Sequence, residues 1–210
     1  MTNRDASVFI VDDDSLIRHA LESLFKSVGL KAHTFASAQE FLETDLPEHP
    51  CCLILDIRMP SISGLDLQQR LTEKGVKIPI IFITGHGTVP MSVRAMKAGA
   101  VDFLQKPFED QELLDAAQRS IELDRQTRKE QTEISDIKRG VKSLTSREYE
   151  VFVLVIAGLL NKQIASELDL SENTVKSHRA SIMKKMNAES LADLVRFAEK
   201  AGIETRRNDA

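Results

Sequence analysis

Apolar residues in the first half of the chain follow two alternating patterns. Short runs of β-branched and aromatic residues alternate with stretches whose apolar positions lie three or four residues apart, as on one face of a helix. The predicted strands are Ser7–Asp12, Lys31–Phe35, Cys51–Asp56, Pro79–Thr84 and Val101–Gln105. The predicted helices are Leu16–Val28, a short helix opened by Ser37 and Glu40, Leu65–Glu73, Thr88–Ala98 and a helix that begins near Glu109. This alternation predicts an α/β fold with a doubly wound, five-stranded parallel sheet.

The last part of the chain has helical patterns throughout. The expected helices are Tyr149–Ala157, Lys162–Leu168, Glu172–Met186 and residues 190–200. Thr145 and Glu148 form a capping-box pattern before the first of them, and Ser171 is the expected cap of the third. These residues therefore predict a second, all-α domain of four helices.

Apolar residues nearly vanish between the two halves, from Glu122 to Gly140. This stretch predicts a solvated helical linker. The alternative is a continuing helix that pairs with a second copy of the chain, although its heptad pattern is sparse. The predicted organisation is a first domain over residues 1–123, a helical linker over 124–142, a second domain over 143–203 and a disordered tail over 204–210.

Composition narrows the class of protein. The chain has 210 residues, of which 42% are hydrophobic and 29% charged, as expected of a globular protein with two small domains. Its apolar runs are far shorter than the roughly 18 residues of a membrane span. The polar N-terminus does not resemble a signal peptide, and the adjacent Cys51 and Cys52 cannot join distant segments. We therefore expect a cytoplasmic protein with no membrane partner.

The net charge of −4 is unevenly distributed along the chain. Residues 1–124 contain 12 Lys and Arg against 19 Asp and Glu, whereas residues 125–210 contain 16 against 13. An acidic half joined to a mildly basic half indicates two separate tasks.

Acidic residues follow two of the predicted strands. Asp12 and Asp13 come after the first strand and Asp56 after the third, and Lys106 follows the fifth. The carboxyl ends of parallel strands meet at one edge of the sheet, so we expect these side chains to lie together. Close carboxylates repel each other unless a cation lies among them, and oxygen ligands suit Mg²⁺. The cluster, with the hydroxyl of Thr84 after the fourth strand, predicts phosphoryl transfer onto Asp56.

Each of these residues also has an ordinary structural interpretation. Asp12 and Asp13 could cap the following helix, although Asp14 is better placed to do so. Thr84 could be a turn residue before Gly85, and Lys106 a surface lysine. The occurrence of all of them at successive strand ends favours the functional interpretation.

Residues 7–123 resemble the receiver domain of two-component response regulators, which has the CheY-like fold with strand order 2-1-3-4-5. The resemblance rests on Asp12–Asp13, on Asp56 followed by Met59–Pro60 and Gly64, on Thr84–Gly85 and on Lys106–Pro107. The segment from Ile83 to Gly87 and the segment Met96–Ala100 are similar to the FixJ subgroup.

This resemblance implies a role for each matching residue. Asp56 would accept a phosphoryl group from a sensor histidine kinase, and Lys106 would hold that group. Asp12, Asp13, Asp56 and the backbone carbonyl of Arg58 would bind Mg²⁺. Thr84 and Phe103 would form a switch pair, although a lone Phe in a strand is ordinarily a core residue. The Lys106–Pro107 peptide bond is expected to be cis.

Helix 172–186 is basic, with no acid after Glu172. Val175, Ile182 and Met186 form its expected buried stripe. It follows a short helix, and this pair predicts a helix-turn-helix whose second helix enters the major groove of DNA. The plain alternative is a solvated basic face on a helical bundle.

Residues 143–199 resemble the LuxR/NarL-type DNA-binding domain. The similarity rests on Leu144–Glu148, Asn161–Ala165 and Leu170–His178. By position, Lys176, Ser177 and Ala180 would face the groove. The implied phosphate contacts are Lys162, Thr174, Arg179 and Lys184. Ala180 replaces the larger polar residue that many relatives carry, so it offers only apolar contact to a base.

The whole chain thus resembles a FixJ/StyR-like response regulator. The resemblance implies a transcription regulator that forms a homodimer on phosphorylation, binds promoter DNA and works with RNA polymerase, as an activator. Its only chemistry would be phosphorylation and dephosphorylation of its own Asp56. Three alternatives stay open: an Mg²⁺ phosphatase with its nucleophile after the first strand, a regulator whose receiver only dimerises or docks without phosphorylation, and a relay whose basic domain binds protein.

Overall fold

The computed structural model describes residues 6–85 and 87–203. Its first part contains a five-stranded, fully parallel sheet with the order β2-β1-β3-β4-β5. The strands are β1 (Ser7–Val11), β2 (Lys31–Phe35), β3 (Cys51–Asp56), β4 (Ile80–Thr84) and β5 (Asp102–Gln105). The predicted fold class and strand order are therefore confirmed.

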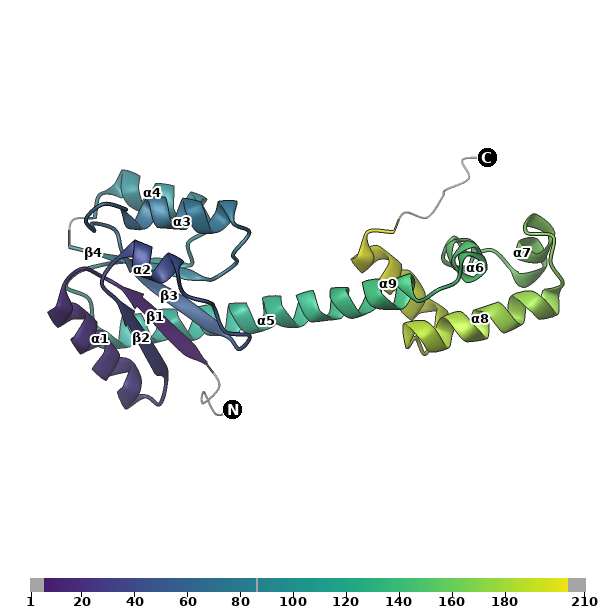
Figure 1. Ribbon diagram of the computed structural model, residues 1–210, viewed down its shortest axis with the longest axis horizontal. Coiled ribbons are helices and arrows are strands. Elements are labelled where there is room, and N and C mark those ends of the chain that lie inside the picture. The colour runs from purple at the N-terminus through teal and green to yellow at the C-terminus, as the bar shows by residue number, and fades with distance from the viewer. Residues whose placement is uncertain (1–5, 86, 204–210) are drawn as a thin grey trace. The chain divides into compact units, whose positions relative to one another are not determined.

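Helices cover both faces of this sheet (Figure 1). They are α1 (Ser15–Ser27), α2 (Ala38–Leu42), α3 (Gly64–Glu73), α4 (Val89–Lys97) and α5 (Asp110–Lys142). Helices α1 and α5 share one apolar core with the sheet, and α2, α3 and α4 share the other. Every residue of β1, β3 and β4 is buried, as the apolar runs predict, and Cys51 and Cys52 lie fully inside.

The helix starts follow the expected capping chemistry. Asp14 caps α1 by accepting a hydrogen bond from the backbone N–H of Leu16. Ser37 and Ser63 cap α2 and α3 in the same way. Because Asp14 fills the capping role, Asp12 remains available to the cluster at the end of β1.

The second part of the chain is a helical unit with its own core. Its helices are α6 (Ser146–Ile156), α7 (Asn161–Glu167), α8 (Glu172–Met186) and α9 (Leu191–Ala201). The predicted buried stripe of α8, formed by Val175, Ile182 and Met186, is confirmed. The capping box of Thr145 and Glu148 at the start of α6 is also present.

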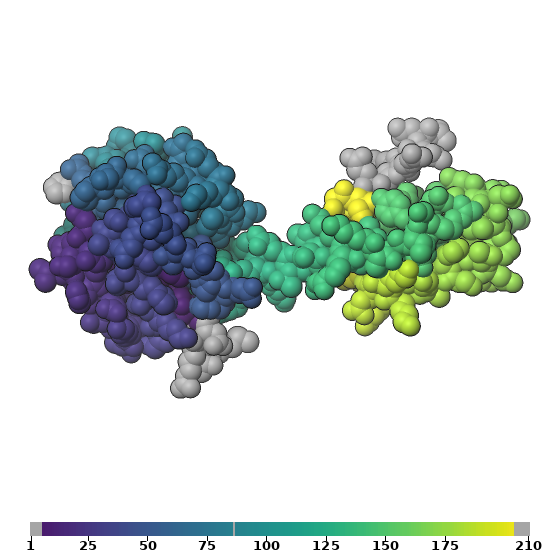
Figure 2. All heavy atoms as spheres, in the orientation of Figure 1, coloured from purple at the N-terminus to yellow at the C-terminus, as the bar shows by residue number. Residues whose placement is uncertain are grey.

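The chain divides into two compact units between Arg128 and Lys129, and Figure 2 shows the close packing of each unit by itself. Two residues of the stretch that was predicted to be solvated are buried instead. Asp124 is 2% exposed within the first unit, and Ile137 joins the core of the second. The tail 204–210 lies outside the described residues. Within the described residues, no helix has the length and apolar character that a membrane span requires.

Candidate functional site

The sheet brings two of the three predicted acids, Asp12 and Asp56, together with Lys106 at its carboxyl edge. The ammonium of Lys106, just beyond β5, donates to Asp12 Oδ2 at 2.6 Å and to Asp56 Oδ1 at 3.1 Å. Asp12 is 1% exposed and Asp56 6% exposed. Asp12 and Asp56, which lie 94 and 50 positions before Lys106 in the chain, thus share its ammonium as a hydrogen-bond donor.

Burial and charge act in opposite directions on this cluster. Burial raises the pKa of the Asp56 carboxyl, Asp12 adds to that shift, and Lys106 opposes it. Burial by itself lowers the pKa of the Lys106 ammonium, but the hydrogen bonds and charges of Asp12 and Asp56 outweigh it, so the pKa is raised. Lys106 therefore stays protonated at neutral pH and places a positive charge beside both acids.

The donor chemistry of the cluster suits a hard divalent cation. Asp12 and Asp56 offer carboxylate oxygens, and the Arg58 N–H donates to Asp56 Oδ2 at 2.7 Å, which orients that carboxylate. Asp13 is exposed. Among the described residues no three metal-binding side chains converge as they stand. The ammonium of Lys106 hydrogen-bonds to both buried acids. The residues fit Mg²⁺ by chemistry, and Asp13 and the carbonyl of Arg58 would complete the oxygen set.

Thr84 and Phe103 lie on the neighbouring strands β4 and β5, two positions apart in register, since Phe103 pairs with Phe82 and Thr84 with Gln105. Thr84 is buried at the end of β4, and Phe103 is half-buried. A Cβ atom at Gly87 would lie 3.0 Å from Phe103 Cε1 and 3.2 Å from Thr84 Cγ2. The predicted switch pair therefore packs around one glycine. The predicted cis bond between Lys106 and Pro107 is present.

Gly64 is a further residue of this site, and its role was not predicted. A Cβ atom there would lie 2.3 Å from the carbonyl oxygen of Asp56 and 3.1 Å from Ile57 Cα. Its own N–H donates to the carbonyl of Ile57 at 3.0 Å. The start of α3 thus packs directly on the backbone of Asp56, which only glycine allows.

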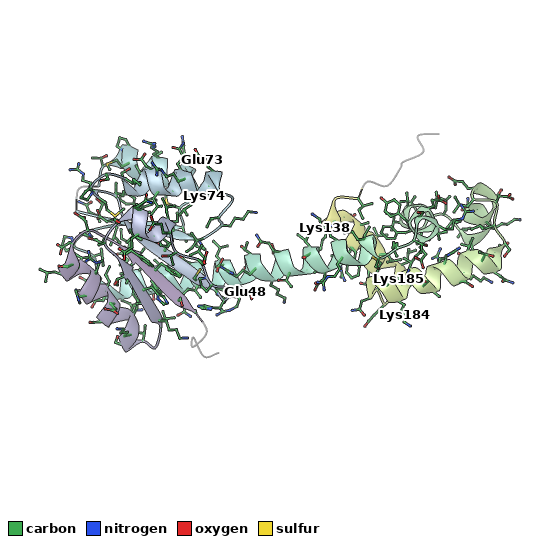
Figure 3. All side chains as sticks on the ribbon, in the orientation of Figure 1. Glu48, Glu73, Lys74, Lys138, Lys184 and Lys185 are labelled. Carbon is green, nitrogen blue, oxygen red and sulfur yellow. The ribbon has the colours of Figure 1, made fainter. Side chains whose placement is uncertain are left out.

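The second unit carries several of the residues predicted to contact DNA on α8. Lys176, Ser177, Ala180 and Lys184 are exposed on α8, away from its buried stripe. Figure 3 shows Lys184 beside Lys185 near the C-terminal end of this helix.

The other predicted contacts are less uniform. Lys162, in the first turn of α7, is exposed, whereas Thr174 and Arg179 are half-buried. The hydroxyl of Thr174 lies 2.8 Å from Ser171 Oγ. Thr174 therefore also helps to order the start of α8.

Two residues of α6 hold the helix-turn-helix in place, and sequence reasoning missed both. Glu148 accepts hydrogen bonds from Ser181 Oγ and from Lys185 Nζ, each at 2.6 Å. Arg147 donates to the carbonyl of Leu168, which ends α7. The Thr145–Glu148 pattern did point to this place, but it was interpreted only as the start of a helix.

We expect Glu148→Gln to destabilise the second unit by about 1–3 kcal/mol at neutral pH, because Lys185 loses its charged partner. Hydrogen bonds to Lys185 and Ser181 lower the pKa of Glu148 to about 2. A lowered pKa contributes stability that is present above the ordinary value of 4.5 and is lost as the pH falls toward 2. The variant should therefore lose less stability than wild type over that range.

Urea unfolding followed by tyrosine fluorescence measures this effect. Tyr149 is the only tyrosine of the chain, which has no tryptophan, and it lies in α6. Glu167→Gln, at an exposed position of α7, is the matched control. Equal acid sensitivity of wild type and Glu148→Gln would contradict the assignment.

Comparison with known proteins agrees with both halves of the structure. Residues 8–118 match the model of the response regulator receiver domain, and residues 142–198 match that of the bacterial regulatory proteins of the luxR family. Nodulation protein W of Bradyrhizobium diazoefficiens is 52% identical over 204 residues, which cover 97% of this chain and 90% of the relative. The response regulator TodT of Pseudomonas putida is 50% identical over 201 residues, covering 95% and 88%.

Solved structures give the same result. The response regulator StyR is 49% identical with a TM-score of 0.85, covering 93% of this chain and 99% of that one. Full-length FixJ from B. japonicum is 40% identical with a TM-score of 0.57, covering 97% and 100%. A receiver sheet and a LuxR-type helical unit in one chain define a two-domain signalling protein.

The chain belongs to the response regulators of two-component systems, in the group that resembles StyR, TodT and FixJ. It is a transcription regulator and not a classical enzyme. Membership implies a sensor kinase and promoter DNA as partners, and receiver domains normally use Mg²⁺ for phosphorylation.

Proposed function

We propose that this protein is switched on by phosphorylation of Asp56 by a sensor histidine kinase and then binds promoter DNA as a homodimer. The observation that carries this proposal is the ammonium of Lys106 shared between two buried carboxylates, Asp12 and Asp56. This arrangement puts a positive charge beside the buried carboxyl group of Asp56. In the proposed function the protein activates transcription together with RNA polymerase.

In the transfer step, a carboxylate oxygen of Asp56 attacks the phosphorus of the kinase phosphohistidine. A P–O bond forms as the P–N bond breaks, and the imidazole, already protonated on its other nitrogen, leaves as the neutral ring. Lys106 then pairs with a phosphoryl oxygen, and the Arg58 N–H keeps the carboxyl group oriented. Asp12, Asp13, Asp56 and the carbonyl of Arg58 would hold Mg²⁺, which would supply positive charge to the phosphoryl oxygens. Hydrolysis of the same bond resets the protein.

The switch proposed here uses Thr84 and Phe103. The hydroxyl of Thr84 moves to the new phosphoryl group, and the Phe103 ring fills the space that it leaves. This change remodels the surface of α4, β5 and the start of α5, where the homodimer forms. Val93 and Met96 of α4 are each 45% exposed and supply apolar contact there.

DNA binding follows from the outer face of α8. In this proposal Lys176, Ser177 and Ala180 meet base edges, while Lys162, Thr174, Arg179 and Lys184 meet phosphates and fix the register. Because phosphate contacts release counterions, added salt should weaken binding steeply.

The proposal is tested by incubating the full chain with acetyl phosphate and Mg²⁺, followed by intact mass and size-exclusion chromatography. Wild type and the control Asp45→Asn, an exposed acid, should each gain one phosphoryl group and shift toward dimer. Asp56→Asn should do neither. Equal labelling of Asp56→Asn would show that the acceptor is another residue. No labelling of wild type would favour a receiver that docks or dimerises without phosphorylation.

A further inference from the structure

A buried ion pair holds α5 to the amino edge of the sheet, at the opposite end from Asp56. Asp124 is 2% exposed, and its Oδ2 accepts from the Cys51 N–H at 2.8 Å and from Arg128 Nε at 2.6 Å. One carboxylate oxygen of Asp124 thus connects Cys51, the first residue of β3, to Arg128, one turn further along α5.

Arg128 extends this contact to the loop before β3, the loop that carries Glu48 in Figure 3. Its guanidinium donates to the carbonyl of Pro47 at 3.0 Å and lies 3.7 Å from Cys51 Sγ. Burial raises the pKa of the Cys51 thiol to about 11, so the sulfur is a neutral packing partner and not a nucleophile. We call Asp124, Arg128 and their partners at Pro47 and Cys51 the α5 clamp.

The chemistry of the clamp indicates a positioning role. Burying a carboxylate is costly, and an apolar pair of similar volume would stabilise the fold at least as well. Charged groups add a fixed geometry that an apolar pair lacks, because the planar guanidinium of an arginine donates to several acceptors in one defined orientation. The clamp therefore fixes two properties of α5 at the point where it leaves the sheet: its rotation about the helix axis and its position along that axis.

The clamp and the phosphoacceptor lie at the two ends of the same strand. β3 begins at Cys51 and ends at Asp56, and six extended residues span about 16 Å. All of β3 is buried between its neighbours β1 and β4. One close-packed strand therefore connects the phosphoacceptor to the clamp.

We propose that Asp124 and Arg128 are positioning residues that couple phosphorylation of Asp56 to DNA binding by the second unit. This inference rests on the proposed function. Neither residue touches the phosphoacceptor. Their contribution is to keep the departing segment of α5 fixed to β3, so that a change at the acceptor is passed on.

The test uses the full chain with the double substitution Asp124→Leu/Arg128→Met, which removes both charges together and leaves no buried charge unpaired. The matched control is Glu122→Gln/Arg125→Gln, which removes an exposed ion pair from the same helix. The probe is a fluorescent DNA duplex selected from a random pool by phosphorylated wild type. Each protein is titrated with this duplex with and without acetyl phosphate and Mg²⁺, and phosphoryl uptake is measured by mass.

Phosphoryl uptake should be the same in all three proteins. Wild type and the control should gain at least about tenfold in DNA affinity on phosphorylation, and the double variant less than about threefold. If the clamp were purely structural, the ratio of DNA affinities with and without phosphorylation would be unchanged. A gain in affinity as large as that of wild type in the double variant would therefore overturn the proposal. If wild type takes up no phosphoryl group or gains no affinity, the proposed function itself fails, and the clamp proposal with it.

Arg128→Lys keeps the proposal testable if the double variant does not fold. Lysine retains the charge beside Asp124 but cannot engage the Pro47 carbonyl and the carboxylate with one planar fork. The affinity gain of this variant should fall at least about threefold below that of wild type. An unchanged gain in a folded Arg128→Lys protein overturns the proposal as well.

Discussion

Gly64→Ala should lower the free energy of unfolding of the first unit by about 3 kcal/mol and should greatly slow phosphoryl uptake by Asp56. The new methyl group would lie 2.3 Å from the carbonyl oxygen of Asp56. This neighbour is backbone inside a buried strand, so it cannot turn away as a flexible side chain would. Either α3 moves outward or the end of β3 is displaced, and each change disturbs the acceptor.

Hydrogen exchange of the β3 amides measures the stability, and intact mass after treatment with acetyl phosphate measures the uptake. Gly85→Ala is the matched control, because a Cβ atom at Gly85 meets nothing within 4 Å. The control should stay within about 0.5 kcal/mol of wild type. If hydrogen exchange of β3 and phosphoryl uptake in Gly64→Ala were the same as in wild type, α3 and β3 would not be packed as described.

Lys106→Met should cost the first unit about 2 kcal/mol at neutral pH in the absence of divalent cations. The substitution leaves Asp12 and Asp56 buried without their shared ammonium. Because Lys106 lowers the pKa of Asp56, its removal should raise that pKa further. An acid with a raised pKa destabilises the fold above that pKa. The loss of unfolding free energy in Lys106→Met, relative to wild type, should therefore become smaller as the pH falls. Mg²⁺ should also restore more stability to the variant than it adds to wild type.

Hydrogen exchange of β3 at neutral and mildly acidic pH, with and without millimolar Mg²⁺, tests this prediction. Lys74→Met removes an exposed lysine at the end of α3, which Figure 3 labels, and serves as the control. If the deficit in Lys106→Met were independent of both pH and Mg²⁺, the charge relation described for Asp12, Asp56 and Lys106 would be wrong.

Local pattern was sufficient to predict most of the fold. The bounds of β2, β3 and α8 agree with the predicted ranges because each of these segments has an uninterrupted pattern with clear end signals. The meeting of Asp12, Asp56 and Lys106 was also predictable, since parallel topology places the carboxyl ends of neighbouring strands at one edge.

What could not be predicted depends on contacts between distant residues. Asp124 lies in a polar stretch and is buried only because the Cys51 N–H, 73 positions away, offers it a partner. Ile137 is an isolated apolar residue in the sequence, yet it completes the core of the second unit. The link from Glu148 to Lys185 likewise spans 37 positions, so no local pattern contains it.

The buried cysteines of β3 have a practical consequence. Burial raises the pKa of both thiols, so neither Cys51 nor Cys52 reacts with alkylating reagents while the sheet is closed. The rate at which they become labelled therefore reports the opening of the first unit, just as Tyr149 reports the second. The same inertness leaves a cysteine introduced at Ser177 as the one reactive thiol, so a fluorophore can be attached to the outer face of α8 without replacing Cys51 or Cys52.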